Sequence, residues 1–263
     1  MADTPRKEAP RRGGGSGPLT EYLRQSSRPL PSLAFVLPLL VIYEVGVLVL
    51  GPQAVRNGAD VWLRQFLDWS GFGQYFLLPA LTIALLLAWH HLTRDRWRVS
   101  AAVVYVMFAE CAILGLVLVG CGRLQAMAAQ SLVDPGVPDE AQRAALALAL
   151  PMGAAPAIGR IVGYMGAGVY EEMLFRLMLL PPVAACAWRI GAQRGLRIVM
   201  AVLLTSLLFS AAHYLGRYGE EFNTFSFAFR FLAGVFFAVL FVYRGFGIAA
   251  GTHALYDVFV SVG

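Results

Sequence analysis

The stretch Gly168-Val169-Tyr170-Glu171-Glu172-Met173-Leu174-Phe175-Arg176 places two adjacent carboxylates and an arginine inside an apolar run. A charged side chain at the centre of a bilayer costs about 2.5–3.5 kcal/mol on insertion scales, so such groups usually have a function. On a helix, Glu172 and Arg176 are one turn apart with the acid first, whereas Glu171 points about 100° away. We expect a membrane helix in which Arg176 braces Glu172 and leaves Glu171 as a general base. A purely structural ion pair is the alternative.

The composition around this stretch is that of an integral membrane protein. The 263 residues are 58% hydrophobic and 14% charged, and no strand-type alternation is present. Apolar runs of about 18–22 residues suit the roughly 30 Å of a hydrocarbon core. We therefore predict an all-α, polytopic transmembrane helical bundle of seven spans, or eight if Ala141–Leu150 or Pro181–Ile190 adds one. The predicted spans are Pro31–Leu50, Tyr75–His91, Val99–Gly120, Ile158–Leu180, Ile198–Tyr214, Phe225–Tyr243 and Gly247–Val262.

The basic residues set the expected orientation. Only Lys7 among the 21 basic residues is a lysine, and the arginines gather at the ends of apolar runs, which speaks for membrane orientation and against nucleic-acid binding. Residues 1–28 should form a disordered cytoplasmic tail, with the C-terminus outside after seven spans. In the following region, 29–156, Asp60–Trp69 should lie in the membrane interface, with Trp62, Phe66 and Trp69 on one stripe and charges elsewhere.

Two later apolar helices carry further polar pairs, Phe209-x-x-x-His213 and His253-x-x-x-Asp257. A lone histidine such as His213 is usually interfacial, and the His253–Asp257 spacing serves a metal site, an oriented catalytic histidine or a local hydrogen bond. Their occurrence on separate helices together with the Glu171 stretch favours an active site inside the membrane. The zinc-protease pattern His-Glu-x-x-His is absent. We expect no cofactor, or else a divalent metal such as zinc on His213, His253 and Asp257.

In order along the chain, the motifs Glu171-Glu172-x-x-x-Arg176, Phe209-x-x-x-His213 and His253-x-x-x-Asp257 resemble those of the CAAX protease and bacteriocin-processing family of intramembrane glutamic endopeptidases. The resemblance covers about 158–263. It implies a helical bundle that hydrolyses peptide bonds, with Glu171 and His213 activating a water and His253 with residue 257 stabilising the oxyanion. One departure stands out. Asn is commoner at position 257, and an ionised Asp can only accept a hydrogen bond.

The resemblance also implies a domain division and a setting. Residues 157–263 would form the catalytic helical core, and a membrane-associated protein or peptide would be its substrate. The arginine bias suggests a bacterial source, and so a multi-pass protein of the inner membrane with its N-terminus in the cytoplasm. The alternative is a non-catalytic membrane protein, either a bacteriocin immunity factor or a proton-coupled transporter with a Glu110, Glu171 and Glu172 relay. Transport would favour inverted repeats, which the sequence lacks.

Overall fold

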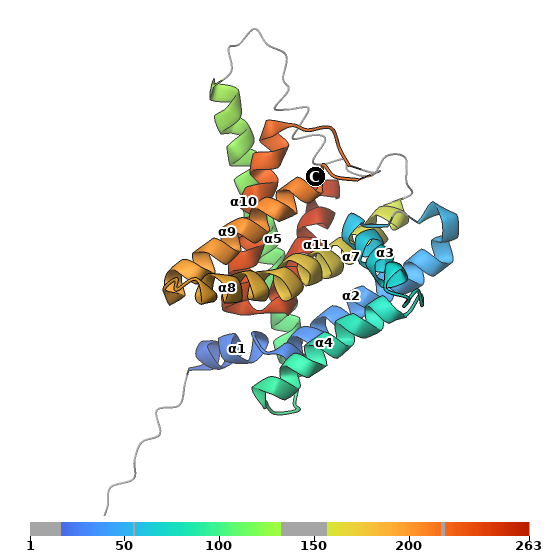
Figure 1. The fold of residues 1–263 in the computed structure, drawn as a ribbon, viewed down its shortest axis with the longest axis vertical. Coiled ribbons are helices and arrows are strands. Elements are labelled where there is room, and N and C mark those ends of the chain that lie inside the picture. The colour runs from blue at the N-terminus through green and yellow to red at the C-terminus, as the bar shows by residue number, and fades with distance from the viewer. Residues whose placement is uncertain (1–16, 55, 133–156, 217–218, 263) are drawn as a thin grey trace, which may run out of the picture.

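The computed structural model describes residues 17–54, 56–132, 157–216 and 219–262, and within them every regular element is a helix. The predicted all-α class is confirmed for this part of the chain. Figure 1 shows the arrangement. In chain order the elements are α1 (Pro18–Ser26), α2 (Pro29–Leu50), the short η1 (Gly51–Gln53), α3 (Gly58–Trp69), α4 (Leu77–Thr93), α5 (Ala101–Leu132), α7 (Ala157–Glu172), η2 (Met173–Leu179), α8 (Leu180–Arg189), α9 (Arg194–Ala212), α10 (Thr224–Arg244) and α11 (Phe246–Val262).

Four of these helices, α2, α5, α9 and α10, are long and apolar enough to cross a membrane, while α4 and α11 are shorter apolar helices. Many large aliphatic side chains on them face outward, for example Ile42, Leu48 and Val49 on α2. A helix that is apolar on its outer face needs a lipid environment. The protein is therefore a multi-pass membrane protein, and the count of seven or eight spans stays a prediction. The candidate extra span Ala141–Leu150 lies outside the described residues.

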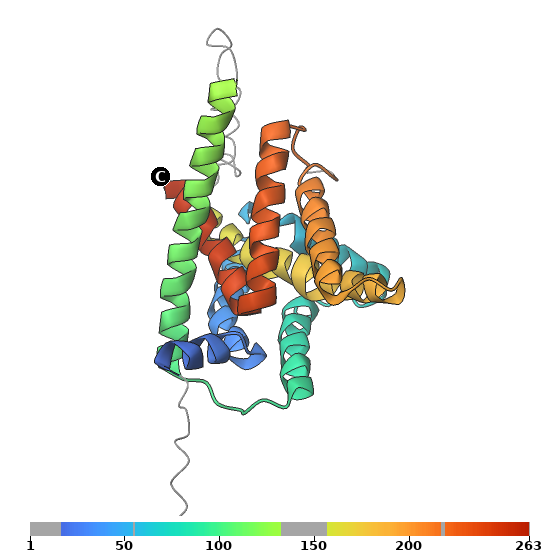
Figure 2. The ribbon, with the colours of Figure 1, turned by 90° about the vertical axis from the view of Figure 1, so that its left-hand side faces the viewer.

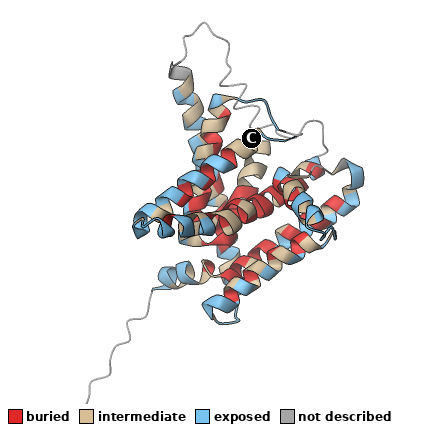
Figure 3. Ribbon diagram, in the orientation of Figure 1, coloured by how far each residue is buried: buried red, intermediate tan, exposed pale blue. Residues whose placement is uncertain are grey.

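Helix α11 approaches both α7 and α2 closely because small residues line these contacts. A Cβ on Gly168 would lie 2.5 Å from the carbonyl oxygen of Ala250, and one on Gly251 would lie 2.3 Å from the ring of Phe35 on α2. Small residues let membrane helices pack backbone against backbone. In Figures 1 and 2, α7, η2 and α8 run across α5 and α10, and in Figure 3 the buried residues concentrate on α7 and on the helices around it.

The expectation that residues 1–28 form one disordered tail is wrong for Pro18–Ser26, which is helix α1. Arg244 at the end of α10 binds Glu110 of α5 at 2.7 and 2.6 Å, and Tyr22 of α1 donates to the same carboxylate. Arg244 also donates to the Ser26 hydroxyl at 2.9 Å. A composition rich in polar residues predicts disorder, but these partners lie far away in the sequence and hold α1 on the bundle.

The helix predicted at Asp60–Trp69 is present as α3, with the side chains of Phe66 and Trp69 exposed, and its place in the membrane interface stays a prediction. The stripe pattern predicted that the charged side chains of α3 would face water, but one of them does not. Asp60 is fully buried, and its carboxylate forms ion pairs with Arg64 at 2.6 Å and with Arg56 at 2.9 Å. Tyr43 of α2 donates to Asp60 at 2.8 Å, and Arg64 pairs with Glu44 of α2 at 3.0 Å, so polar contacts hold one face of α3 on α2. Helix α3 also lies beside α7.

Candidate active site inside the bundle

The turn after α7 holds a fully buried ion pair. Arg176 lies in η2, a π-helical segment, with its Nε 3.1 Å from Glu172 Oε2. Its Nη2 donates to the carbonyl of Gly234 on α10 at 3.1 Å, and its guanidinium carbon lies 4.4 Å from the ring centre of Phe209 on α9. π-Helical turns are rare and often mark functional sites. The expected pairing of Glu172 with Arg176 is therefore present. Through Arg176 the pair also contacts α10 and α9.

The second oxygen of Glu172 orients a histidine. Glu172 Oε1 lies 2.8 Å from His253 Nδ1, so the imidazole donates its Nδ1 proton to the carboxylate. The ring of Phe237 stacks on the same imidazole, with centres 4.5 Å apart and planes 11° apart. Arg176, Glu172 and His253 form one continuous chain from η2 to α11. The chain leaves Nε2 of His253 as the nitrogen that faces the rest of the site.

Glu171 points to a different side of α7. Its Oε1 accepts a hydrogen bond from the side-chain amide of Asn57, at the N-terminus of α3. Its buried Oε2 accepts no hydrogen bond from the described protein groups. That oxygen lies 3.9 Å from His213 Nε2 and 3.8 Å from His253 Nε2. Two histidine nitrogens from two other helices thus converge on the free oxygen of Glu171.

The tautomer of His213 follows from its other nitrogen. His213 ends α9, and its Nδ1 lies 2.8 Å from the carbonyl oxygen of Phe209. A carbonyl oxygen only accepts, so Nδ1 carries the proton and Nε2 of the neutral ring carries a lone pair. The Phe209 ring packs edge-on against the imidazole, with centres 5.0 Å apart. The neutral ring therefore offers an acceptor to the space beside Glu171.

Asp257 completes the group at its outer edge. Its Oδ2 lies 3.8 Å from His253 Nε2, and its side chain is 22% exposed. The structure thus brings together the six residues that the sequence indicates, Glu171, Glu172, Arg176, His213, His253 and Asp257, on α7, η2, α9 and α11. In the described residues no three His, Cys, Asp or Glu side chains form a group that could hold a metal, and the metal alternative on His213, His253 and Asp257 stays an expectation to be tested.

Asn57 is a site residue that the sequence reasoning missed. Its Oδ1 accepts from the backbone N–H groups of Ala59 and Asp60, which caps α3, and this leaves its amide N–H free for Glu171. An Asn just before an amphipathic run is a signal for a helix N-cap. Nothing in the local pattern indicates a partner 114 residues away.

Replacing Arg176 with Ala should destabilise the protein strongly, because it leaves Glu172 charged and uncompensated in a buried site. Breaking a buried pair costs about 3–5 kcal/mol. The measurement is the thermal unfolding midpoint of the purified protein in detergent. Arg24→Ala is the matched control, because it breaks the largely exposed pair with Glu21, and such pairs contribute about 0–1 kcal/mol. Equal midpoints for the two variants would contradict the role of Arg176 as a brace.

Comparison with known proteins adds a family to this geometry. Residues 153–259 match the family model of the type II CAAX prenyl endopeptidases, described as Rce1-like. Neither the curated proteins nor the solved structures gave a match to the chain. The matched segment contains the three motifs and all six residues of the site, in agreement with the resemblance drawn from the motifs. Residues 153–259 are thus similar to the Rce1-like type II CAAX prenyl endopeptidases.

Proposed function

We propose that the protein is an intramembrane endopeptidase that hydrolyses peptide bonds of membrane-associated proteins or peptides. The observation that carries this proposal is the convergence of His213 Nε2 and His253 Nε2 on Oε2 of Glu171, a buried oxygen that accepts no hydrogen bond from the described residues. A carboxylate base, a neutral histidine and a second histidine held in a fixed orientation are the groups that transfer of an acyl group to water requires. The family match supports peptide bonds as the target.

In the proposed mechanism a water molecule binds between Glu171 and His213. The lone pair on His213 Nε2 orients one water hydrogen, and Glu171 Oε2 takes the proton as the oxygen attacks the scissile carbonyl carbon. The tetrahedral intermediate carries its negative charge on the former carbonyl oxygen. Collapse breaks the C–N bond, and Glu171 returns its proton to the leaving amine. Hydrolysis is then complete and Glu171 is ionised again, so the scheme needs only water and no further proton donor or acceptor.

His253 and Asp257 are proposed to stabilise the oxyanion. A protonated His253 donates from Nε2, since Nδ1 is already committed to Glu172. The Glu172–Arg176 pair is a positioning device, because it fixes which nitrogen of His253 faces the substrate. No step in this scheme requires a metal, and we propose that catalysis is metal-free.

The transporter alternative loses support from the placement of Glu110. The proposed relay needs this carboxylate free to exchange protons with Glu171 and Glu172. Glu110 instead accepts two hydrogen bonds from Arg244 and one from Tyr22, and so fastens α1 to the bundle. The proposed endopeptidase mechanism uses Glu171, His213 and His253 and does not need Glu110.

Glu171→Gln should abolish cleavage while the protein still folds, because the amide keeps the size of the side chain but cannot take a proton. Loss of a general base lowers rates by about 10²–10⁴-fold. The test compares membrane-protein fragments by mass spectrometry in cells that express the wild type, Glu171→Gln or the exposed control Glu221→Gln. Fragments found with the wild type and the control should be absent with Glu171→Gln. Their persistence would move the base to another residue.

Asn57→Asp separates the capping role of this residue from its contact with Glu171. Aspartate caps a helix as well as asparagine does, but it cannot donate to Glu171 and adds a charge beside it. We expect cleavage to fall at least tenfold, because the donor to Glu171 is lost and a like charge is added beside it, while α3 keeps its cap. Asn223→Asp makes the same change at the cap of α10, where the side chain accepts from Ser226, and should leave activity intact. Equal activity of both variants would remove Asn57 from the site.

Asp257→Asn tests the oxyanion assignment, because the roles open to a carboxyl exclude one another. If Asp257 is protonated and donates to the oxyanion, the amide should keep activity and remove any pH dependence due to that proton. If it orients charged His253 or binds a metal, the amide should fail. The measurement is peptide cleavage between pH 5 and 9, with and without a chelator. An inactive variant together with chelator-sensitive wild type would overturn the metal-free scheme.

A further inference from the structure

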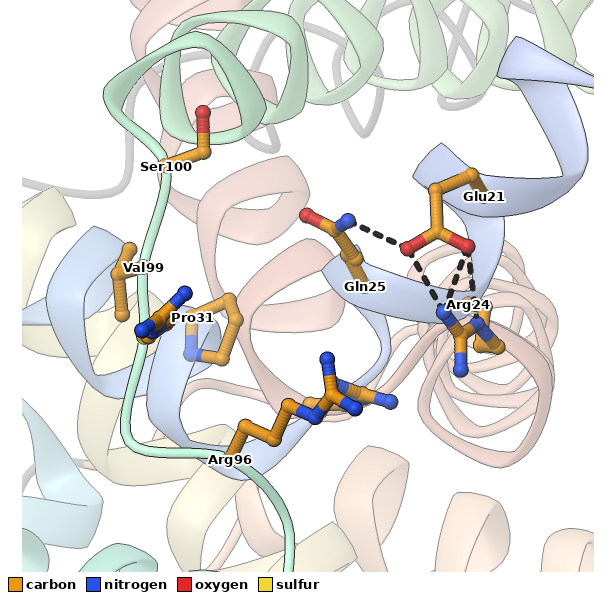
Figure 4. Close-up of a pocket in the computed structure, with 9 residues that line it drawn as sticks. Glu21, Arg24, Gln25, Pro31, Arg96, Val99 and Ser100 are labelled. Atoms are coloured by element: carbon orange, nitrogen blue, oxygen red, sulfur yellow. Dashed lines mark hydrogen bonds and ion pairs between the residues drawn. The ribbon is translucent and has the colours of Figure 1, made fainter.

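A pocket of about 490 Å³ lies outside the catalytic site, where α1 and the start of α2 face residues 94–100 between α4 and α5. Figure 4 shows that its side chains come from both walls, with Arg96 reaching from the connection toward α1. Basic residues dominate this lining, with one acid, Glu21, among them. The arginines are Arg24, Arg28, Arg96 and Arg98. Pockets of this size are typical of small-ligand sites.

The charges in this arginine pocket are only partly compensated. Glu21 binds Arg24 at 2.6 Å, and Arg28 lies 3.3 Å from Asp95. Arg96 and Arg98 are exposed, and no ion pair involves either side chain within the described residues. Two guanidinium groups are therefore available to an anion, with two further arginines beside them. Guanidinium groups recognise phosphate through paired N–H donors.

The wall formed by α1 is held in place from behind. Arg244 donates to the carbonyl of Leu23 at 3.1 Å and to the hydroxyl of Ser26 at 2.9 Å, and Ser26 is fully buried. Its bidentate bond to Glu110 carries this attachment on to α5. Arg24 of α1 thus projects from a fixed element, and Arg28 follows that element directly, which lowers the entropy that binding would otherwise cost.

The position of α1 suits the level of lipid headgroups. In Figure 2 it lies across the end of the long apolar helix α5. Leu19 and Leu23 are exposed on α1, as is Trp97 on the connection. Helix α1 combines these exposed leucines with the basic Arg24, and short helices with apolar and basic sides lie in the membrane interface, where Trp is enriched. The anion that is concentrated at this level is the phosphate of a phospholipid.

We propose that the arginine pocket binds the phosphate group of an anionic phospholipid, with Arg96 and Arg98 as the main contacts. A free phosphate ion shares the same chemistry. The lipid is favoured as the source because Leu19, Leu23 and Trp97 beside the pocket can pack on its acyl chains. This site is separate from the catalytic residues and does not depend on the proposed protease activity.

The test measures lipid retention by native mass spectrometry on the full chain in detergent, titrated with phosphatidylglycerol or with phosphatidylcholine. The wild type should retain phosphatidylglycerol preferentially. The double variant Arg96→Gln/Arg98→Gln should bind it roughly tenfold more weakly or worse, from the contribution of each arginine near an anionic lipid surface. Arg189→Gln/Arg194→Gln removes two exposed arginines elsewhere and should behave as the wild type. Ser100→Glu adds an acid to the pocket lining and should weaken retention likewise.

The unfolding midpoint in lipid-free detergent should be the same for all these variants, because the changed side chains are exposed. Equal retention by the pocket variants and the wild type would overturn the proposal. An equal loss of phosphatidylglycerol retention in the Arg189/Arg194 control would also overturn it, because that result would mean that retention depends on the net charge of the protein and not on the pocket. A third arm adds inorganic phosphate without lipid. Displacement of phosphatidylglycerol by millimolar phosphate would make a soluble phosphate the ligand and overturn the lipid source.

Discussion

The buried chain of Arg176, Glu172 and His253 is the interaction on which the site depends. Three ionisable groups from η2, α7 and α11 lie in a region with almost no exposure, and each contacts the one before it. An isolated charge at this depth would be costly, so the group is stable only when its members are present together. That mutual dependence fixes the register between the helices. It also fixes the orientation of the His253 imidazole without using the second carboxylate, Glu171.

Close helix packing makes the chain possible. Glu172 can reach His253 only because Gly168 lets α7 approach the backbone of α11 at Ala250. The aromatic rings of Phe209 and Phe237 fill the space around the polar groups and contact both Arg176 and His253. Such rings keep out bulk water, and this strengthens every electrostatic contact inside. Glycines and aromatics therefore prepare an environment in which a few polar atoms dominate the chemistry.

The N-terminal helices contribute to the site although the family match begins only at residue 153. Asn57 reaches Glu171 from the start of α3, and Glu44 of α2 accepts hydrogen bonds from Tyr170 and Arg64. These contacts place α2 and α3 against the part of α7 that carries Tyr170 and Glu171. The N-terminal region is thus more than an anchor, and it supplies one direct partner of the proposed general base. The same region carries the arginine pocket on its interfacial side.

The sequence by itself determined the helical class, the approximate positions of the apolar helices and the set of polar residues that the structure brings together, although α5 continues to Leu132, beyond the predicted end at Gly120. Helix length and apolar character are local properties, and charged residues in apolar runs are conspicuous because burial is costly. Spacing along one helix also indicated the pair of Glu172 with Arg176. The tertiary structure alone decided which histidine meets which carboxylate, because the partners are far apart in the sequence. Glu171 and His213 are 42 positions apart, and Glu172 and His253 are 81 positions apart. It also decided that Asn57 turns to Glu171 and that α1 is ordered by Arg244. Those outcomes depend on helix packing, which no local pattern of residues encodes.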